Sequence, residues 1–126
     1  MATTNSVFIT WGMSILGREA VGLEVFDSGI AYFARLKHDG ILDDFKVGLA
    51  EHGSFDLVSG YVVLEGSEEK LNRVLKSDEY RTLIIKAAHV ASNVVVVPCF
   101  AGEAIAQRVE QFISARAALG ISGAAQ

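Results

Sequence analysis

The chain of 126 residues has few of the features that mark cross-linked or nucleic-acid-binding proteins. It has one cysteine, so an internal disulfide is excluded, and a single thiol is typical of a reducing compartment. Its 11 basic residues against 15 acidic ones give a net charge of -4, which does not attract phosphate backbones. We therefore predict that nucleic acid is not a partner.

Long apolar runs are also missing. The apolar run of residues 94–97 is far too short to span a bilayer. The first six residues are polar and uncharged, without the basic start and apolar run of a signal peptide. We expect no membrane association and a cytoplasmic location.

The chain is rich in apolar residues. Hydrophobic residues make up 51% of the sequence and charged residues 21%, which is typical of a compact globular protein. At this length the chain is one domain and can bury a core without disulfides or a metal. We predict a single domain over residues 7–118, with flexible ends at 1–6 and 119–126.

The fold is organised around residues 57–80. Residues 57–65 are rich in β-branched and aromatic side chains, and alternation makes both faces apolar, as in a strand covered on both sides. Ser67, followed by two glutamates, predicts the N-cap of a short helix. Ser77 repeats this signal with Asp78 and Glu79 behind it, so the helix should break near Ser77.

The remaining segments complete an α+β pattern. Alternating residues predict strands at 7–12, 45–49 and 93–100, and Pro98 should place the last strand at an edge of the sheet. Helical periodicity runs from about 18 to 39, with a buried stripe expected at Leu23, Phe26, Ile30 and Phe33. A last amphipathic helix should begin after residue 102. Its apolar side is expected to hold Ile105, Val109, Phe112 and Ile113.

This order is the ferredoxin-like βαββαβ plan with an added C-terminal helix. Helices should cover one face of a four-stranded antiparallel sheet. The other face also carries large apolar side chains, and such a patch is rarely left to water. A second copy related by twofold symmetry is the expected cover, so we predict a homodimer.

The segment that joins the central strand to the broken helix carries a family likeness. Residues 60–80 read GYVVLEGSEEKLNRVLKSDEY. With the length and the element order, this run resembles the dimeric α+β barrel superfamily, which includes antibiotic-biosynthesis monooxygenases and muconolactone isomerase-like proteins. The resemblance implies a homodimer whose sheets form a barrel, with a pocket between sheet and helices. It brings no catalytic motif that can be placed residue by residue.

Four aromatic residues are candidates for binding a small apolar or aromatic molecule: Trp11, Phe26, Phe33 and Tyr61. Aromatic side chains at such spacings more often form plain core. Gly22 and Gly29 in the long helix remove side-chain volume and favour a pocket, although close packing of the helix on the sheet explains them more simply. A filled core and an open pocket both stay open at this point.

Catalytic signals are sparse. No histidine, cysteine or carboxylate set has metal-ligand spacing, so we predict neither a metal nor a cofactor. His52, beside Glu51 in a predicted turn, is the one candidate acid or base. The first hypothesis is therefore a binding protein. The alternative is a cofactor-free monooxygenase or isomerase for an aromatic or polyketide-like substrate, positioned by Trp11 and Tyr61.

Overall fold

The computed structural model describes residues 3–53 and 55–121. The elements follow the predicted order: β1 (Ser6–Trp11), α1 (Glu19–His38), β2 (Asp44–Leu49), β3 (Gly60–Glu65), α2 (Glu68–Leu75), α3 (Asp78–Val90), β4 (Val95–Cys99) and α4 (Glu103–Ala118). Of the ends predicted to be flexible, residues 1–2 and 122–126 lie outside the described part of the chain.

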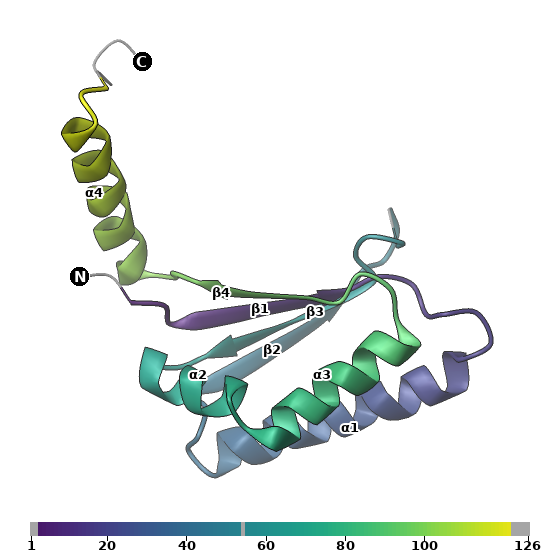
Figure 1. The fold of residues 1–126 in the computed structure, drawn as a ribbon. Coiled ribbons are helices and arrows are strands. Elements are labelled where there is room, and N and C mark those ends of the chain that lie inside the picture. Colours follow the sequence, from purple (N-terminus) through teal and green to yellow (C-terminus); the bar gives the residue numbers. More distant parts are fainter. Residues whose placement is uncertain (1–2, 54, 122–126) are drawn as a thin grey trace.

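The four strands form one antiparallel sheet in the order β2-β3-β1-β4. Helices α1, α2 and α3 lie together on one side of this sheet (Figure 1). This arrangement confirms the predicted α+β, ferredoxin-like fold. Strand β4 pairs with β1 alone, so Pro98 lies in an edge strand as expected.

Both predicted serine caps are present. The Ser67 hydroxyl accepts a hydrogen bond from the Lys70 backbone N–H at the start of α2, and Ser77 accepts one from the Tyr80 N–H at the start of α3. Each satisfies a backbone donor that a helix N-terminus leaves free. The helix therefore breaks at Ser77, as predicted.

The stripe predicted for α1 is partly wrong. Phe26, Ile30 and Phe33 face inward, but Leu23 is 66% exposed. The partner predicted for the helix glycines is also wrong. A Cβ at Gly29 would lie 3.4 Å from Leu83 Cδ1, and one at Gly22 would lie 3.8 Å from Val90 Cβ, so both glycines face α3 rather than the sheet.

The two faces of the sheet differ sharply in burial. The face toward the helices carries Val7, Ile9, Val62 and Leu64, each no more than 5% exposed. The opposite face, here called the open face, carries Phe8, Tyr61, Val63, Val95 and Val97. Phe8 and Tyr61 are each 37% exposed although they belong to central strands. The predicted second apolar face is therefore present.

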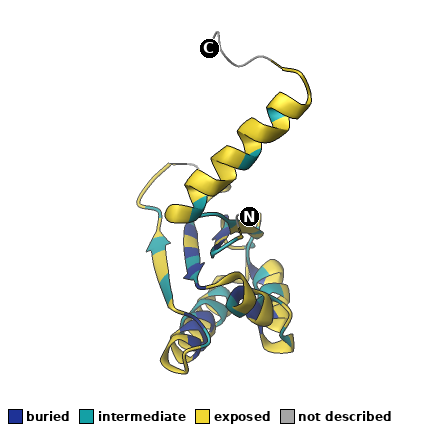
Figure 2. Cartoon of the chain, turned by 90° about the vertical axis from the view of Figure 1, so that its left-hand side faces the viewer, coloured by how far each residue is buried: buried dark blue, intermediate teal, exposed yellow. Residues whose placement is uncertain are grey.

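Helix α4 stands apart from the rest of the domain. It projects from the end of β4, on the side of the sheet away from α1–α3 (Figures 1 and 2). None of its residues is buried, and Figure 2 shows it exposed along almost its whole length. None of the helices in the described ranges is long and apolar enough to cross a membrane.

Candidate functional site: an apolar cavity between sheet and helices

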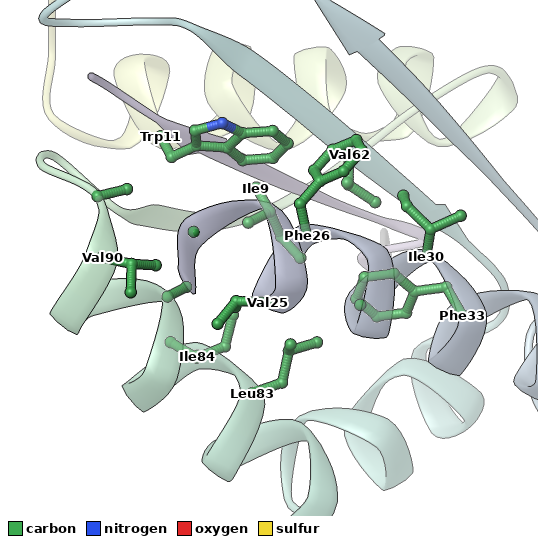
Figure 3. A pocket seen from close by; sticks show the side chains of 14 residues that line it. Ile9, Trp11, Val25, Phe26, Ile30, Phe33, Val62, Leu83, Ile84 and Val90 are labelled. Atoms are coloured by element: carbon green, nitrogen blue, oxygen red, sulfur yellow. The ribbon is translucent and has the colours of Figure 1, made fainter. Parts of the chain in front are cut away.

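An apolar cavity of about 90 Å³ lies between the sheet and helices α1 and α3 (Figure 3). The sheet supplies its roof, α1 supplies one wall, and α3 with the residue after it supplies the other. The lining residues are Ile9, Trp11, Gly22, Val25, Phe26, Gly29, Ile30, Phe33, Val62, Leu83, Ile84, Ala87, Val90 and Ala91.

Strand alternation and register explain the roof. Ile9 and Trp11 are two residues apart on β1, so both side chains point toward the helices. Ile9 pairs with Val62 on the neighbouring strand β3. Trp11 pairs with Gly60, and a Cβ at Gly60 would meet the indole ring. The missing side chain at Gly60 therefore makes room for the Trp11 ring at the end of the cavity.

The walls come from two helices that approach closely. Phe26 on α1 meets Trp11 edge-on, with ring centroids 5.9 Å apart. Gly29 lets Leu83 on α3 come close to the α1 backbone. Because Gly22, Gly29 and Ala87 contribute almost no side-chain volume, space remains where three large residues would otherwise close the core.

The cavity lining offers almost no polar group. Among the fourteen lining residues, the Trp11 indole nitrogen is the one polar side-chain atom (Figure 3). A single water needs about 10–15 Å³ and two to four polar partners, so this volume is large enough for water but lacks the groups to hold it. The geometry suits a small apolar guest and gives no charge stabilisation to an ionic one.

Three of the four predicted ligand-binding residues come together. Trp11, Phe26 and Phe33 all line the cavity. Tyr61 lies on the open face instead, where its ring stacks on Phe8 with centroids 5.7 Å apart and covers Gly48. The structure separates Tyr61 from the other three, and a ligand-binding role for Tyr61 stays a prediction that concerns the open face.

The predicted acid or base His52 lies in the exposed loop between β2 and β3. The end of that loop is tied to the cavity, because the Ser59 N–H donates to the Trp11 carbonyl oxygen at 2.7 Å. His52 lies seven positions before Ser59 in the sequence and is not among the residues that line the cavity. In the described part of the chain, no three His, Cys, Asp or Glu side chains are placed to hold a metal ion.

The sequence reasoning missed the contribution of α3 to the site. Leu83, Ile84 and Ala87 form part of the wall, and Val90 continues it. Their spacing of one and three residues is typical of a buried helix face. Nothing in that spacing says that the buried face borders a cavity, since this depends on how far α1 and α3 stand from the sheet.

Two tyrosines lie buried in the helix layer, outside the cavity lining. Burial raises the pKa of Tyr80 to about 12, and the neighbouring Tyr32 adds to this effect. Burial also raises the pKa of Tyr32, although its contact with the Ser77 hydroxyl opposes the rise. Within the described residues the Tyr80 hydroxyl has no hydrogen-bond partner. Because ionisation of a buried tyrosine is unfavourable, we expect the helix layer to become less stable at high pH.

Solved structures of two other proteins share this fold. One is SnoaB, a cofactor-independent oxygenase from Streptomyces nogalater, with 16% sequence identity, a TM-score of 0.50, and 80% of this chain and 96% of that chain covered. The other is PA3566 from Pseudomonas aeruginosa, with 14% identity, a TM-score of 0.52, and coverage of 81% and 98%. No protein-family profile matches the sequence. No curated protein matches it either.

At these identities the likeness shows the fold alone. It confirms the predicted ferredoxin-like α+β fold, with helices on one face of a four-stranded antiparallel sheet. The role of the chain has to be argued from its own cavity and surfaces.

Proposed function

We propose that this protein binds a small apolar or aromatic molecule in the cavity between the sheet and helices α1 and α3. The observation that carries this proposal is the lining, which is apolar apart from the indole nitrogen of Trp11. Small-molecule sites are mostly apolar and concave, with few polar groups that orient the ligand. Trp11, Phe26 and Phe33 are the aromatic groups proposed to contact the guest.

The volume limits the size of this molecule. Pockets for drug-sized ligands measure roughly 300–1,000 Å³, whereas this cavity measures about 90 Å³. A single small ring or a short branched chain is the matching class. A polyketide with several fused rings would need α1 and α3 to move apart first.

We also propose that the protein is a homodimer in which the open face is covered by a second copy. Exposed apolar side chains on three strands support this: Phe8 on β1, Tyr61 on β3, and Val95 and Val97 on β4. A contiguous apolar patch on a soluble protein marks an interaction site. The single cysteine supports a reducing, cytoplasmic location as part of the same proposal.

Tryptophan fluorescence tests the binding proposal directly, because Trp11 is the sole tryptophan and lies in the cavity wall. Titration with toluene should shift or quench its emission and saturate. Ala87→Leu should abolish this response because the larger side chain fills the cavity. Ala88→Leu is the matched control, since Ala88 is exposed on the same helix and should leave the response unchanged.

Two results would contradict the proposal. One is an emission spectrum that does not change at toluene saturation. The other is an equal response in wild type, Ala87→Leu and Ala88→Leu, which would place the binding elsewhere. Thermal unfolding of each variant, followed by circular dichroism, confirms that the comparison is made on folded protein.

A cofactor-free monooxygenase or isomerase is the second candidate, favoured by one observation: a structure of the same fold is that of a cofactor-independent oxygenase. The cavity offers no proton acceptor of its own, and His52 is exposed in a loop outside the lining. This candidate predicts oxygen consumption with a small phenolic substrate. His52→Ala and Tyr61→Phe should each reduce it if these residues act in the reaction, and unchanged rates would remove them from it.

A further inference from the structure

Helix α4 carries an apolar side that the rest of the described chain leaves exposed. This side, here called the α4 stripe, consists of Ile105, Val109, Phe112 and Ile113, which are 52%, 49%, 63% and 48% exposed. Gln107 and Ser114 lie on the opposite side of the same helix. A helix of this length is only marginally stable in water unless an amphipathic face packs on something. The α4 stripe therefore indicates a partner.

The base of α4 is held firmly against the domain. The Asn5 side chain donates from Nδ2 to the Ala101 carbonyl oxygen at 2.9 Å, and the Ala101 N–H donates to Asn5 Oδ1 at 2.7 Å. Arg108 on the first turns of α4 lies 5.4 Å from the Phe100 ring centroid. Gly102 between them has a φ of 59°, a conformation that glycine adopts without strain. These contacts fix where the helix leaves the sheet.

The direction in which α4 leaves is the informative part. It extends on the side of the open face, away from α1–α3, in both views of the molecule (Figures 1 and 2). Helix α4 and the open face lie on the same side of the sheet. A second copy that packs on the open face would therefore also contact α4.

The total surface agrees with a large contact. The chain exposes 8248 Å², whereas a folded monomer of its mass, 13.5 kDa, exposes about 6,500 Å² by the usual scaling. The surplus of about 1,700 Å² shows that the chain, with its projecting α4, is less compact than a typical folded monomer of its mass. A second copy that covers both the open face and α4 would account for such a surplus.

About a fifth of this chain has no counterpart in the comparison structures. They are covered over 96% and 98% of their length, but only 80% and 81% of this chain is covered. The uncovered fifth is about as long as residues 103–126.

We propose that α4 is an intersubunit arm, which packs its apolar stripe on a second copy of this chain rather than on its own subunit. The inference rests on the proposed homodimer and adds the element that holds it together. The stripe makes the arm apolar where it meets the partner, and the Asn5–Ala101 hydrogen bonds keep it extended toward the partner.

Sedimentation of three proteins tests the proposal: wild type, Val109→Glu/Phe112→Glu, and the control Gln107→Glu/Ser114→Glu. Both double variants add two negative charges to α4, but only the first adds them to the α4 stripe. We expect the stripe variant to raise the dimer dissociation constant at least about a hundredfold, because two buried apolar side chains are lost from the interface. The control should sediment as wild type does.

The outcomes separate this inference from the dimer itself. A wild type that is monomeric overturns both proposals. A dimeric wild type with an equally dimeric stripe variant overturns only the arm, and assigns α4 to its own open face, a lipid surface or another protein. Circular dichroism of the variants checks that α1–α3 and the sheet still fold.

Hydrogen exchange gives a second measurement that needs no substitution. Amides of α4 in the wild-type dimer should exchange at least about tenfold more slowly than after dilution to the monomer, because packing on the partner removes the fraying of an isolated helix. Rapid exchange of α4 at both concentrations would overturn the arm even if the protein is a dimer.

Discussion

The two faces of the sheet are made from the same strands and yet have opposite environments. On β3, Leu64 is fully buried under the helices, while Tyr61, on the other face of the same strand, is 37% exposed. Both faces carry large apolar side chains, and the open face also carries the charged Lys46 and Glu65. The difference is what covers each face. Three helices pack on the covered face, whereas among the described residues no helix packs on the open face.

This comparison assigns different tasks to the two faces. The covered face is packed except at the cavity, where Gly22, Gly29 and Ala87 leave space beneath Trp11. The open face exposes apolar side chains of β1, β3 and β4, and α4 projects on the same side of the sheet. We infer that the covered face serves the small molecule and the open face serves the second copy. The following changes test that division, from the largest expected effect to the smallest.

Leu64→Ala should have the largest effect on stability. Leu64 is 0% exposed in the centre of the covered face, and truncation of such a residue costs about 2–5 kcal/mol of unfolding free energy because a cavity is left. The loss should not depend on protein concentration. Urea unfolding at two concentrations measures it.

Val63→Ala is the matched change on the open face of the same strand. It should cost less than about 1.5 kcal/mol, and the loss should vary with protein concentration because it acts through the interface. If Leu64→Ala and Val63→Ala lowered the unfolding free energy equally and independently of protein concentration, the proposed distinction between the two faces would be contradicted.

Phe8→Glu should weaken the dimer and spare the cavity. Phe8 stacks on Tyr61 in the middle of the open face, so a charge there should raise the dimer dissociation constant by about thirtyfold or more, equivalent to about 2 kcal/mol. Sedimentation measures this, with the exposed helix residue Lys86→Glu as control. Toluene binding by Phe8→Glu should match wild type, and its loss would contradict the separation of the two tasks.

Alkali should loosen the helix layer through Tyr80. In the unfolded chain a tyrosine loses its proton near pH 10, whereas the folded pKa is raised to about 12 by burial. The protonated group therefore stabilises the fold fully below pH 10, and this contribution, about 1–2 kcal/mol, is lost as the pH rises toward 12.

Tyr80→Phe tests this assignment. It should reduce the fall in stability between pH 10 and 12 and leave the part due to Tyr32. At pH 7 it should be neutral or stabilise by up to about 1 kcal/mol, because the Tyr80 hydroxyl is buried without a partner among the described residues. Unfolding curves for wild type and Tyr80→Phe at several pH values test this assignment. Identical dependence of stability on pH in the two proteins would contradict it.

Gly22→Ala should have the smallest effect and the opposite sign. A Cβ at Gly22 meets nothing closer than 3.8 Å, so the helix should gain about 0.5–1 kcal/mol from replacing glycine by alanine. Gly29→Ala should gain less because its Cβ would lie 3.4 Å from Leu83. Thermal unfolding of both variants ranks them, and a loss of stability in Gly22→Ala would contradict the space seen beside α3.

Much of the fold could be predicted because its signals are local. The serine caps at Ser67 and Ser77, the position of Pro98 and the alternation in β1 and β3 each depend on a few neighbouring residues. Together they determine the order of the elements. The buried stripe of α1 was harder to predict, because a helix that packs on both the sheet and α3 buries more than one side. The spacing of Leu23 matched the predicted stripe, but this residue is exposed.

The site could be predicted only in part. Trp11, Phe26 and Phe33 share the cavity, but Tyr61 was grouped with them although it lies across the sheet. Alternation gives the two sides of one strand and does not say how two strands are aligned. The register pairs Tyr61 with Thr10 and so places it on the open face. The position of α4 could not be predicted either, because an apolar stripe in the sequence does not show which surface the helix packs against.

The central claim is that the open face is covered by a second copy. Native mass spectrometry at micromolar concentration tests it most directly. The account predicts a species of twice the 13.5 kDa chain mass, which disappears in favour of the single chain when Phe8 is replaced by glutamate. A wild-type protein that remains a single chain at that concentration would contradict the claim.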